Sequence, residues 1–377
     1  MLEIIREELI GIKEKFNDER RTEIVAGGAD SIEDEDLIPE ENIVITLTHQ
    51  GYVKRLPAST YRTQKRGGRG IQGMGTNDDD FVEHLVSTST HDTVLFFTNK
   101  GKVYRAKGYE VPEFSRTAKG IPIINLLQIE KEEWINAVIS VSEYSSDWYL
   151  FFTTRHGLSK RTNLSQFANI RKGGLIAVGL REEDELMSVR LTDGTRDIMI
   201  GTKNGYLIRF PEDQVRAMGR NAAGVRGISL RDDDEVVSME ILDEGLQVLH
   251  VTNKGIGKRT PEDQYRVTKR GGKGIFTCKL TESNSVVAVK AVTGDEDLML
   301  ITAAGVLIRT PISGISQTGR NAQGVRLIRV QEEEEVATVA VVEQEEDEPE
   351  EDSDESAIET ESAEDDESAD NTEDNGE

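Results

Sequence analysis

The sequence predicts an all-β fold in which six repeats of about 50 residues form a propeller-like array of blades. Three observations lead to this prediction. A Thr-x-x-Gly tetrad recurs six times, a run of β-forming apolar residues precedes each tetrad, and a second glycine follows 17 or 19 residues after the first. Each repeat therefore offers about four short strands separated by turns, and six such units are enough to surround an axis.

The tetrads set the register of the repeats. Their threonines lie at intervals of 50, 56, 48, 50 and 50 residues, at Thr48, Thr98, Thr154, Thr202, Thr252 and Thr302. The apolar runs before them are predicted strands, over Ile43–Leu47, Val94–Phe97, Tyr149–Thr153, Ile198–Gly201, Val248–Val251 and Leu298–Ile301. A tetrad between two strands is typical of a hairpin loop, in which glycine adopts the positive φ that other residues resist.

An arginine follows each tetrad glycine at the fourth position. The six residues are Arg55, Arg105, Arg161, Arg209, Arg259 and Arg309. Two interpretations are open. These arginines either form a cationic rim for DNA or act as structural partners of the acidic loops, such as Asp78–Asp80 and Glu182–Glu185.

Charge is segregated along the chain. The whole sequence has a net charge of −26, yet residues 343–377 hold 20 acidic residues and no Lys or Arg, and residues 1–42 hold 14 acidic and 5 basic residues. The middle, 43–342, holds 37 acidic and 40 basic residues and is weakly cationic. Binding to a polyanion is therefore judged on the middle of the chain alone.

The two ends predict separate segments. Leu2, Ile5, Leu9, Ile12 and Phe16 follow the 3-4-3-4 spacing of a coiled-coil seam, which predicts the end of a connecting helix over residues 1–22. An ordinary amphipathic helix that packs on the domain is the alternative. An acidic linker over 23–41, the six-repeat domain over 42–342 and a disordered acidic tail over 343–377 complete the predicted organisation.

Composition excludes several classes of site. The single cysteine, Cys278, excludes an internal disulfide framework and a cysteine-based zinc site, and it suits a reducing cytoplasm. The five histidines lack metal-ligand spacing, and no Gly-rich nucleotide-binding loop is present. No apolar stretch is long enough to span a membrane. We expect no metal, no cofactor and no membrane contact.

A basic turn surrounds the second glycine of each repeat. The richest turns are Gln64-Lys65-Arg66-Gly67-Gly68-Arg69-Gly70 in the first unit and Thr268-Lys269-Arg270-Gly271-Gly272-Lys273-Gly274 in the fifth. Near Gly120, Gly174, Gly224 and Gly324, the other units carry Arg116 with Lys119, Arg171 with Lys172, Arg220, and Arg320, respectively. The candidate DNA-binding residues are these cations together with Gln64, Gly67, Gly68 and Gly70.

Phosphate chemistry accounts for the composition of these turns. Glycines let a backbone approach a phosphodiester, and Arg and Lys donate charge-assisted hydrogen bonds to its oxygens, while Gln64 adds a neutral donor. The alternative is a structural turn whose arginines pair with the acidic loops of a neighbouring blade. The first turn favours contact with DNA, whereas both interpretations stay open for the single-arginine turns of units four and six.

The residues Gln64–Gly70 resemble the seven-residue box that marks the C-terminal domain of the A-type subunit of DNA gyrase. The six-repeat register and the Phe16–Ile24 stretch agree with this resemblance, which covers roughly residues 1–342. It implies a β-pinwheel, a propeller-like disc whose blades share strands with their neighbours. It also implies that the basic rim binds and bends double-stranded DNA in a right-handed wrap, so that the whole enzyme introduces negative supercoils.

The same resemblance implies partners and limits. The chain would act in the bacterial cytoplasm, associated with the nucleoid, together with the remainder of the A-type gyrase subunit and with the B-type gyrase subunit in an A2B2 heterotetramer. ATP and magnesium would serve that holoenzyme only. Its catalytic tyrosine and its ATPase site lie outside this chain, so no enzyme activity is expected of the chain alone.

Three alternatives compete with this interpretation. The C-terminal domain of the A-type subunit of topoisomerase IV shares the blades, but its box is typically degraded or missing, whereas Gln64–Gly70 is complete. A propeller scaffold for protein partners would carry Trp-Asp dipeptides at its blade ends, which this sequence lacks. A propeller enzyme would need histidines and carboxylates that recur toward the axis, and the histidines do not recur by unit. A role in gyrase is therefore preferred.

Overall fold

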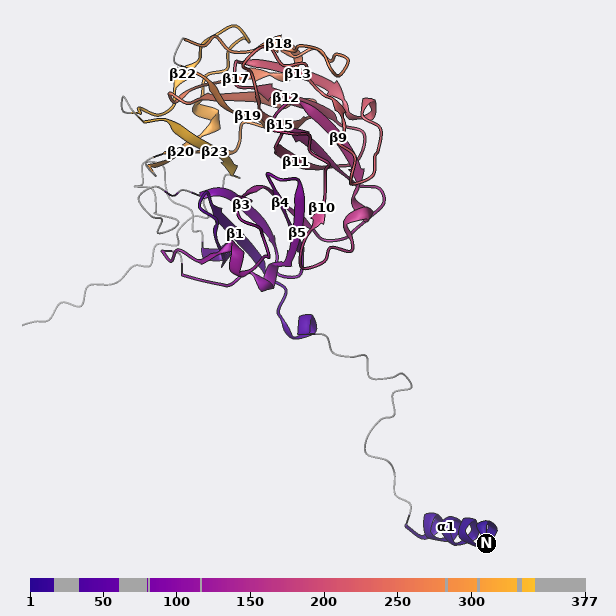
Figure 1. Ribbon diagram of the computed structural model, residues 1–377. Coiled ribbons are helices and arrows are strands. Elements are labelled where there is room, and N and C mark those ends of the chain that lie inside the picture. The colour runs from indigo at the N-terminus through magenta and orange to yellow at the C-terminus, as the bar shows by residue number, and fades with distance from the viewer. Residues whose placement is uncertain are drawn as a thin grey trace, which may run out of the picture.

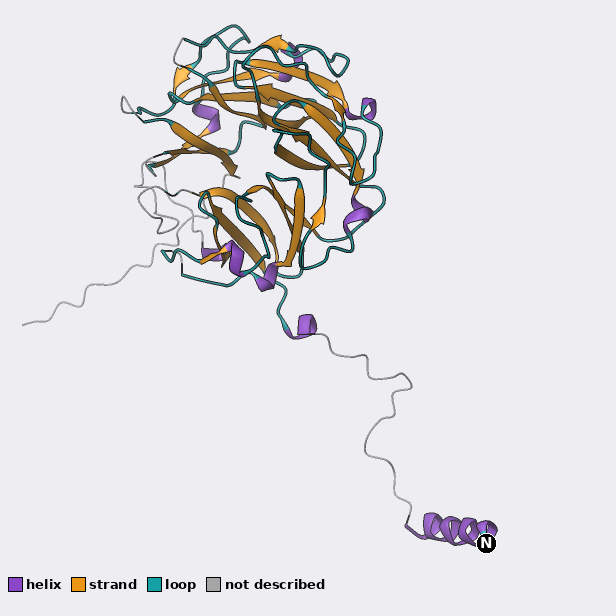
Figure 2. Ribbon diagram, in the orientation of Figure 1, coloured by secondary structure: helices purple, strands orange, loops and turns teal. Residues whose placement is uncertain are grey.

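Six antiparallel sheets surround a common centre (Figure 1). The computed structural model describes residues 1–16, 34–60, 80, 82–115, 117–281, 284–303, 306–330 and 334–342. Within these ranges, every helix after α1 (Leu2–Phe16) is a single short 3₁₀ turn, and strands and loops make up the rest (Figure 2). The fold is a six-bladed β-propeller, which confirms the predicted class.

Each blade is a sheet of three or four strands, counted from the innermost strand at the centre of the ring to the outermost strand at the rim. The innermost strands are β3 (Val82–Ser89), β7 (Ile135–Val141), β11 (Leu186–Thr192), β15 (Val236–Leu242), β19 (Val286–Val292) and β23 (Val336–Val342). The second strands are β1 (Asn42–Thr48), β4 (Thr93–Thr98), β8 (Tyr149–Thr154), β12 (Asp197–Thr202), β16 (Gln247–Thr252) and β20 (Asp297–Thr302). The third strands are β2 (Tyr52–Pro57), β5 (Lys102–Lys107), β9 (Leu158–Asn163), β13 (Tyr206–Pro211), β17 (Ile256–Pro261) and β21 (Leu307–Pro311).

The outermost strand of a blade comes from the following repeat. These strands have two residues each and are β6 (Ile121–Pro122), β10 (Leu175–Ile176), β14 (Val225–Arg226), β18 (Ile275–Phe276) and β22 (Val325–Arg326). In the first blade, for example, Ile121 of the second repeat pairs with Val53 on β2. Strand sharing between neighbours, which the resemblance implied, is therefore present in blades one to five. The sixth sheet has three strands in the described part of the chain.

Short 3₁₀ turns connect the strands. They are η1 (Asp34–Leu37), η2 (Ala58–Thr60), η3 (Gly108–Glu110), η4 (Ile123–Asn125), η5 (Leu164–Phe167), η6 (Glu212–Gln214), η7 (Glu262–Gln264) and η8 (Ile312–Gly314). Most of them directly follow the third strand of a blade, so the chain leaves each hairpin in the same way in successive repeats.

The innermost strands form a closed circle. Each of them contacts the innermost strand of the next blade, and β23 of the sixth blade contacts β3 of the first. The sequence predicted the number of blades but left their closure open. The contact between β23 and β3 closes the ring at its centre.

The threonine of each tetrad is explained by the geometry of the hairpin. In the first unit, Gly51 has a φ of 83° and its N–H donates to Thr48 O at 2.9 Å, while the Thr48 hydroxyl accepts from Tyr52 N at 3.0 Å. The same hydroxyl bond recurs at Thr98, Thr154, Thr202, Thr252 and Thr302. The tetrad therefore combines a positive-φ glycine with a side chain that accepts the next main-chain N–H.

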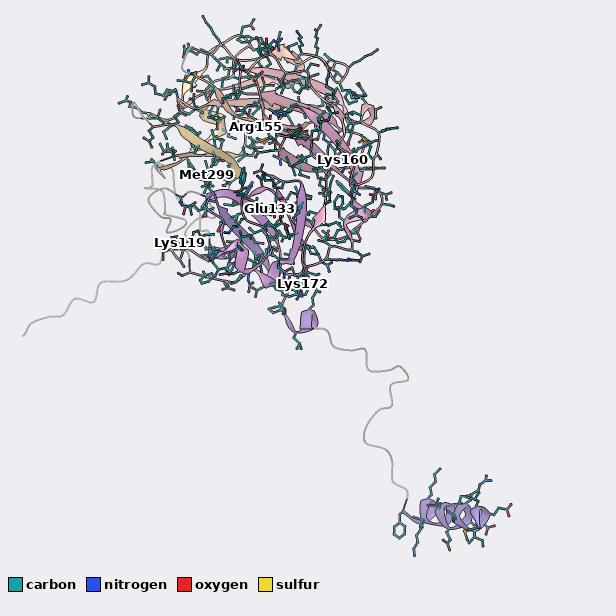
Figure 3. All side chains as sticks on the ribbon, viewed as in Figure 1. Lys119, Glu133, Arg155, Lys160, Lys172 and Met299 are labelled. Carbon is teal, nitrogen blue, oxygen red and sulfur yellow. The ribbon has the colours of Figure 1, made fainter. Side chains whose placement is uncertain are left out.

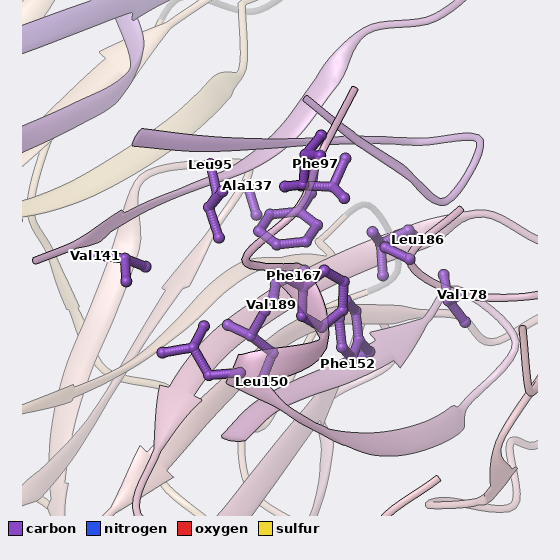
Figure 4. Close-up of a cluster of buried hydrophobic side chains, with 14 residues drawn as sticks. Leu95, Phe97, Ala137, Val141, Leu150, Phe152, Phe167, Val178, Leu186 and Val189 are labelled. Carbon is purple, nitrogen blue, oxygen red and sulfur yellow. The ribbon is translucent and has the colours of Figure 1, made fainter. Parts of the chain in front are cut away.

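Apolar side chains from adjacent blades form the hydrophobic core. In the cluster between the second and third blades, the rings of Phe97 and Phe152 meet edge to face at 5.7 Å, beside Phe167 (Figure 4). All three side chains are fully buried. Val, Leu, Ile and Ala supply the rest of this cluster, so aliphatic residues dominate the packing as the low aromatic content predicts.

A charged triad lies on three adjacent innermost strands. Arg190 on β11, Glu240 on β15 and Lys290 on β19 occupy equivalent register positions, opposite Phe151, Met199 and Leu249, respectively. Glu240 Oε1 lies 2.7 Å from Arg190 Nη2 and 2.8 Å from Lys290 Nζ. The equivalent residues of the first, second and sixth blades are Val86, Ile139 and Ala340. The triad therefore ties three blades together at the centre of the ring.

The N-terminal helix α1 presents its predicted seam to solvent. Leu2, Leu9 and Phe16 are exposed, as are the other apolar residues of the helix. Residues 17–33 lie outside the described residues, so the predicted end of the helix at residue 22 and the linker over 23–41 stay predictions. No helix in the described ranges is long and apolar enough to cross a membrane.

Candidate nucleic-acid interface

The basic turns are held at the rim by the strands that follow them. In repeats two to six, the turn leads directly into the outermost strand of the preceding blade, so the turn of one repeat rests on the third strand of its neighbour. Figure 3 shows Lys119 and Lys172 of these turns toward the outer edge of the disc, whereas Glu133 and Arg155 lie nearer its centre. The predicted residues of units two to six that the structure describes therefore lie beside the outermost strands of the blades.

Two kinds of glycine occur in these turns. In repeats two to six, whose second glycine the structure describes, this glycine packs inward: Gly224 has a φ of 96°, and a Cβ there would lie 2.5 Å from Ser159 O. Gly120, Gly274 and Gly324 likewise approach a main-chain carbonyl of the preceding blade. Gly219, in contrast, faces open space, with nothing within 4 Å of an added Cβ. In the described turns, the second glycines therefore serve blade contact, and outward glycines such as Gly219 leave room for a phosphate.

A matched pair of substitutions separates these two roles. We expect Gly224→Ala to destabilise the domain by about 2 kcal/mol or more, since the new Cβ meets Ser159 O and the backbone must keep a positive φ. Gly219→Ala should leave stability within about 0.5 kcal/mol, because its Cβ enters solvent. Denaturant unfolding of both variants measures the difference. Equal effects would contradict this assignment of the two glycines.

The side chains at the rim differ in their environment. Arg171, Lys172, Lys269 and Lys273 are exposed, and Arg220 is half-buried. In the part of the chain that the structure describes, no carboxylate lies within 4.0 Å of the charged atoms of any of these five cations. Their charges therefore stay available to an external anion.

Other rim cations already have protein partners. Arg270 Nη1 donates to Arg226 O at 3.0 Å, and Arg320 Nη1 donates to Phe276 O at 3.0 Å. Both arginines thereby connect their own turn to the outermost strand of the neighbouring blade. Lys119 Nζ lies 4.5 Å from the centre of the Tyr52 ring. These three side chains brace the rim in the free protein.

The box residues Gln64, Lys65, Arg66, Gly67, Gly68, Arg69 and Gly70 and the unit-two residue Arg116 lie outside the described residues. Their assignment to the DNA-binding surface stays a prediction.

The arginines that follow the tetrads have a structural environment. Arg209 Nε donates to Asp197 Oδ2 at 2.7 Å, and Arg309 repeats this bond with Asp297. Arg259 Nε instead donates to Ile315 O at 2.8 Å. The other three arginines also have partners in the same or the following repeat. Arg55 contacts Glu113, and Arg105 donates to Ala168 O. Arg161 donates to Gly194 O and contacts Glu212. We therefore assign this series to the fold, although its partners are seldom the acidic loops.

The acidic loops pair with the tetrad turns instead. Arg155 contacts both Glu185 and Glu235, at 3.3 and 2.6 Å, and Lys203 contacts Glu235 at 2.9 Å. The Lys254–Glu335 pair at 3.1 Å repeats this pattern in a later blade. Opposite charges are thus compensated at the tetrad ends of the blades. The alternative in which acidic loops neutralise the basic turns finds no support among the described residues.

Two further cations lie at the rim. Arg226 and Arg326 are exposed on the outermost strands β14 and β22. Neither arginine was among the predicted residues, although both follow the second glycine by two positions, in units four and six, and this spacing is the signal that indicates them. They extend the cationic surface of the two turns that contain a single arginine.

No group of three or more His, Cys, Asp or Glu side chains in the described ranges is arranged to hold a metal ion. The chemistry that the rim offers is electrostatic and hydrogen-bonding.

Comparison with known proteins identifies the family. The model of the family described as "DNA gyrase C-terminal domain, beta-propeller" matches residues 42–89, 92–142, 149–193, 196–243, 247–293 and 296–343. The chain belongs to this family. The six matched segments follow the six repeats that the tetrads define.

Relatives of known sequence agree. The chain is 66% identical over 227 residues to the A-type subunit of DNA gyrase from Halalkalibacterium halodurans and 60% identical over 228 residues to that from Staphylococcus epidermidis. These matches cover 60% of this chain but only 27% and 26% of the relatives. The chain thus spans about a quarter of the length of the relatives it matches.

Two solved structures share the fold. The "Structure of DNA gyrase A C-terminal domain" superposes with a TM-score of 0.69 at 28% identity, over 80% of this chain and 100% of that one. The "Crystal structure of the C-terminal domain of DNA topoisomerase IV" gives a TM-score of 0.68 at 25% identity, over 81% and 94%. The fold alone therefore does not distinguish the gyrase domain from the topoisomerase IV domain. The sequence identity to the gyrase relatives, 66% and 60%, is much higher than the identity to either solved structure.

Proposed function

We propose that the rim of this domain binds double-stranded DNA and wraps it in a right-handed sense. The single observation that carries this proposal is the row of rim cations, including Arg171, Lys172, Lys269 and Lys273, that no described carboxylate neutralises. Phosphate contacts of this kind position DNA without reading its bases, so binding should depend little on sequence. Bendable sequences are favoured, because a wrapped duplex must be deformed.

The proposed role belongs to a larger assembly. The relatives are A-type gyrase subunits that are about four times as long as the matched region. The remainder of such a chain, and the B-type gyrase subunit with its ATP and magnesium, would supply strand cleavage and passage. Wrapping by this domain would present a DNA segment to that machinery and give negative supercoils. The domain itself contributes binding and bending.

The topology of a religated nicked circle tests the wrap. The full 377-residue chain is bound to nicked circular DNA, the nick is sealed with ligase, and the linking number is measured after removal of the protein. We expect a positive shift that grows with protein concentration. Arg66→Ala combined with Arg69→Ala in the predicted box should reduce the shift, while Lys100→Ala combined with Lys131→Ala should not. Absence of a shift with the unmodified chain would exclude wrapping.

A further inference from the structure

Three lysines are fully buried beneath basic turns. Lys54 on β2, Lys160 on β9 and Lys258 on β17 are 0, 1 and 0% exposed, and each is the third residue after a tetrad glycine. A lysine is seldom buried to this extent unless its ammonium group finds partners that compensate for lost hydration. The partners of these lysines therefore indicate their role.

Each ammonium group donates to at least one main-chain carbonyl of the turn that rests on it. Lys258 Nζ lies 2.9 Å from Gly319 O and 2.5 Å from Arg320 O, both in the turn of unit six. The other two repeat the arrangement: Lys160 Nζ donates to Arg220 O and Ala177 O, and Lys54 Nζ donates to Ser115 O and Ala118 O. The lysines of one blade thus hold the turn of the next repeat.

The peptide geometry of these turns directs N–H groups outward. Because a trans peptide points its C=O and N–H in opposite directions, the inward Arg220 carbonyl leaves the Asn221 N–H facing away from Lys160. The same holds for Arg320 and Asn321 above Lys258. Both asparagines are exposed, and no described group accepts a hydrogen bond from their main-chain N–H.

Other carbonyls of these turns also accept hydrogen bonds from protein donors. Gly219 O accepts from Ala222 N at 3.1 Å, and Ala222 O accepts from Gly179 N at 3.2 Å. In unit six, Ala322 O accepts from Lys279 N at 3.5 Å. The carbonyls on either side of each asparagine thus face protein donors, while the main-chain N–H groups of Asn221 and Asn321 have no described acceptor and suit a phosphate.

In units three to six, buried lysines and rim cations complement each other, whereas the unit-two turn above Lys54 carries Arg116 and Lys119 as well. The blades that lack a lysine at this position have Tyr104, Ile208 and Ile308. The turns that rest on Tyr104 and Ile208 are those of units three and five, which carry two and three cations of their own. The turns of units four and six carry one arginine each, and these rest on Lys160 and Lys258.

We propose that Lys160 and Lys258 are positioning residues for two phosphodiester sites, at the outward N–H groups of Asn221 and Asn321. This inference rests on the proposed binding of DNA at the rim. Each lysine fixes the peptide that presents the donor and places a positive charge behind it, where counter-ions cannot enter to screen it. Arg220 and Arg320 beside the donors complete the attraction for a phosphate.

The surroundings of Lys160 make its charge sensitive to pH. Burial lowers the pKa of Lys160 to about 7, and the neighbouring charge of Arg220 contributes to the lowering. The groups packed against Lys160 are otherwise neutral, namely the Phe152 ring at 5.3 Å and the carbonyls that accept its hydrogen bonds. A bound phosphate favours the protonated lysine, so DNA binding should take up protons near neutral pH.

Lys258 has a similar environment. Burial lowers its pKa to about 8, the charge of Arg320 contributes to the lowering, and a Cys278 thiolate would oppose it, although burial raises the pKa of Cys278 itself. His250, which lies opposite Lys258 on β16, stays neutral because burial lowers its pKa to about 3. The Tyr265 ring stacked on His250 also stays neutral, since burial raises its pKa to about 12. Lys258 is therefore the group of this cluster that changes its charge between about pH 7 and pH 9.

Neutral substitutions of matched size test the proposal. Lys160→Met combined with Lys258→Met should keep the fold, because a buried charge is replaced by an apolar side chain of similar length. Affinity of the full chain for a short DNA duplex at about 0.1 M salt should fall between about threefold and tenfold per lysine. Ile208→Met, at the same register position of blade four, should leave affinity unchanged.

A pH profile and proton uptake separate positioning from mere stability. The affinity of the unmodified chain should fall as pH rises from about 6.5 to about 9 and the lysines deprotonate, and the double variant should lose that part of the dependence. Calorimetry in two buffers of different ionisation enthalpy should show proton uptake on binding for the unmodified chain.

The outcomes are distinct. If the unmodified chain binds and wraps DNA while the double variant binds equally well with the same pH profile, the lysine proposal is overturned and the proposed function stands. If the unmodified chain does not bind DNA, both fail. Should the double variant not fold, absence of proton uptake by the unmodified chain overturns the lysine proposal, and uptake near neutral pH supports it.

Discussion

Replacing Arg171, Lys172, Lys269 and Lys273 by glutamine is expected to weaken DNA binding by roughly three orders of magnitude at about 0.1 M salt. Each phosphate contact that is lost also removes the release of its counter-ion. The unmodified chain should show a slope of log affinity against log salt on the order of −5 or steeper, at about −0.9 per contact, and the quadruple variant should lose between about 3 and 4 units of it. Titrations of a DNA duplex at several salt concentrations measure both quantities.

A control of equal charge distinguishes the rim from a general electrostatic effect. Lys100, Lys131, Arg155 and Lys203 lie in the tetrad turns and acidic loops rather than in the basic turns. Their replacement by glutamine also removes four positive charges, and it should change affinity and slope only slightly. If both quadruple variants bind DNA with the same loss, net charge rather than the rim governs binding, and the interface assigned to the basic turns is wrong.

Glu240→Gln is expected to destabilise the domain by about 3–5 kcal/mol, because it leaves Arg190 and Lys290 without their shared carboxylate at the centre of the ring. Burial alone would raise the pKa of Glu240, but the charges and hydrogen bonds of Arg190 and Lys290 outweigh it and lower the pKa to about 2. A lowered pKa means that the ionised carboxylate stabilises the folded state above the unfolded pKa of about 4. That contribution is lost as the pH falls toward about 2.

Unfolding measurements as a function of pH check this prediction. The difference in the free energy of unfolding between the unmodified chain and Glu240→Gln should be largest near neutral pH and should decrease below about pH 4. Glu235→Gln, which removes a more exposed carboxylate from the Arg155–Lys203 cluster, should cost about 1 kcal/mol or less. Replacing all three triad residues by leucine, in imitation of the apolar blades, should recover most of the lost stability. An effect of Glu240→Gln no larger than that of Glu235→Gln would contradict the role of the triad.

Sequence analysis predicted the features that each repeat carries within itself. The tetrads, the strands before them and the second glycines depend on local backbone geometry, so they recur at fixed spacing and were found from spacing alone. The contact that explains the second glycine could not be derived from this spacing, because Gly224 meets a carbonyl of a strand more than sixty residues earlier. The spacing of residues within one repeat does not predict a contact between two repeats.

Features that differ between repeats could not be predicted in this way. Glu240 is acidic, whereas the equivalent residues of the neighbouring blades, Arg190 and Lys290, are basic. No residue type therefore recurs at this position, and in the sequence only the 50-residue spacing relates the three residues. Lys160 and Lys258 would be expected at the surface because lysine usually is, and their burial becomes visible only when the next turn covers them. The arginine series after the tetrads was ambiguous for the same reason.

The exchange of outermost strands changes what a DNA molecule on the rim would hold together. A basic turn belongs to one repeat by sequence and to the preceding blade by hydrogen bonding, so it spans the joint between two blades. A duplex that contacts successive turns would therefore bridge every joint that it crosses. Tension in the bent DNA would then pull adjacent blades against each other rather than peel one blade from the ring, and the unfolding of any single blade would require the release of DNA from two neighbouring turns.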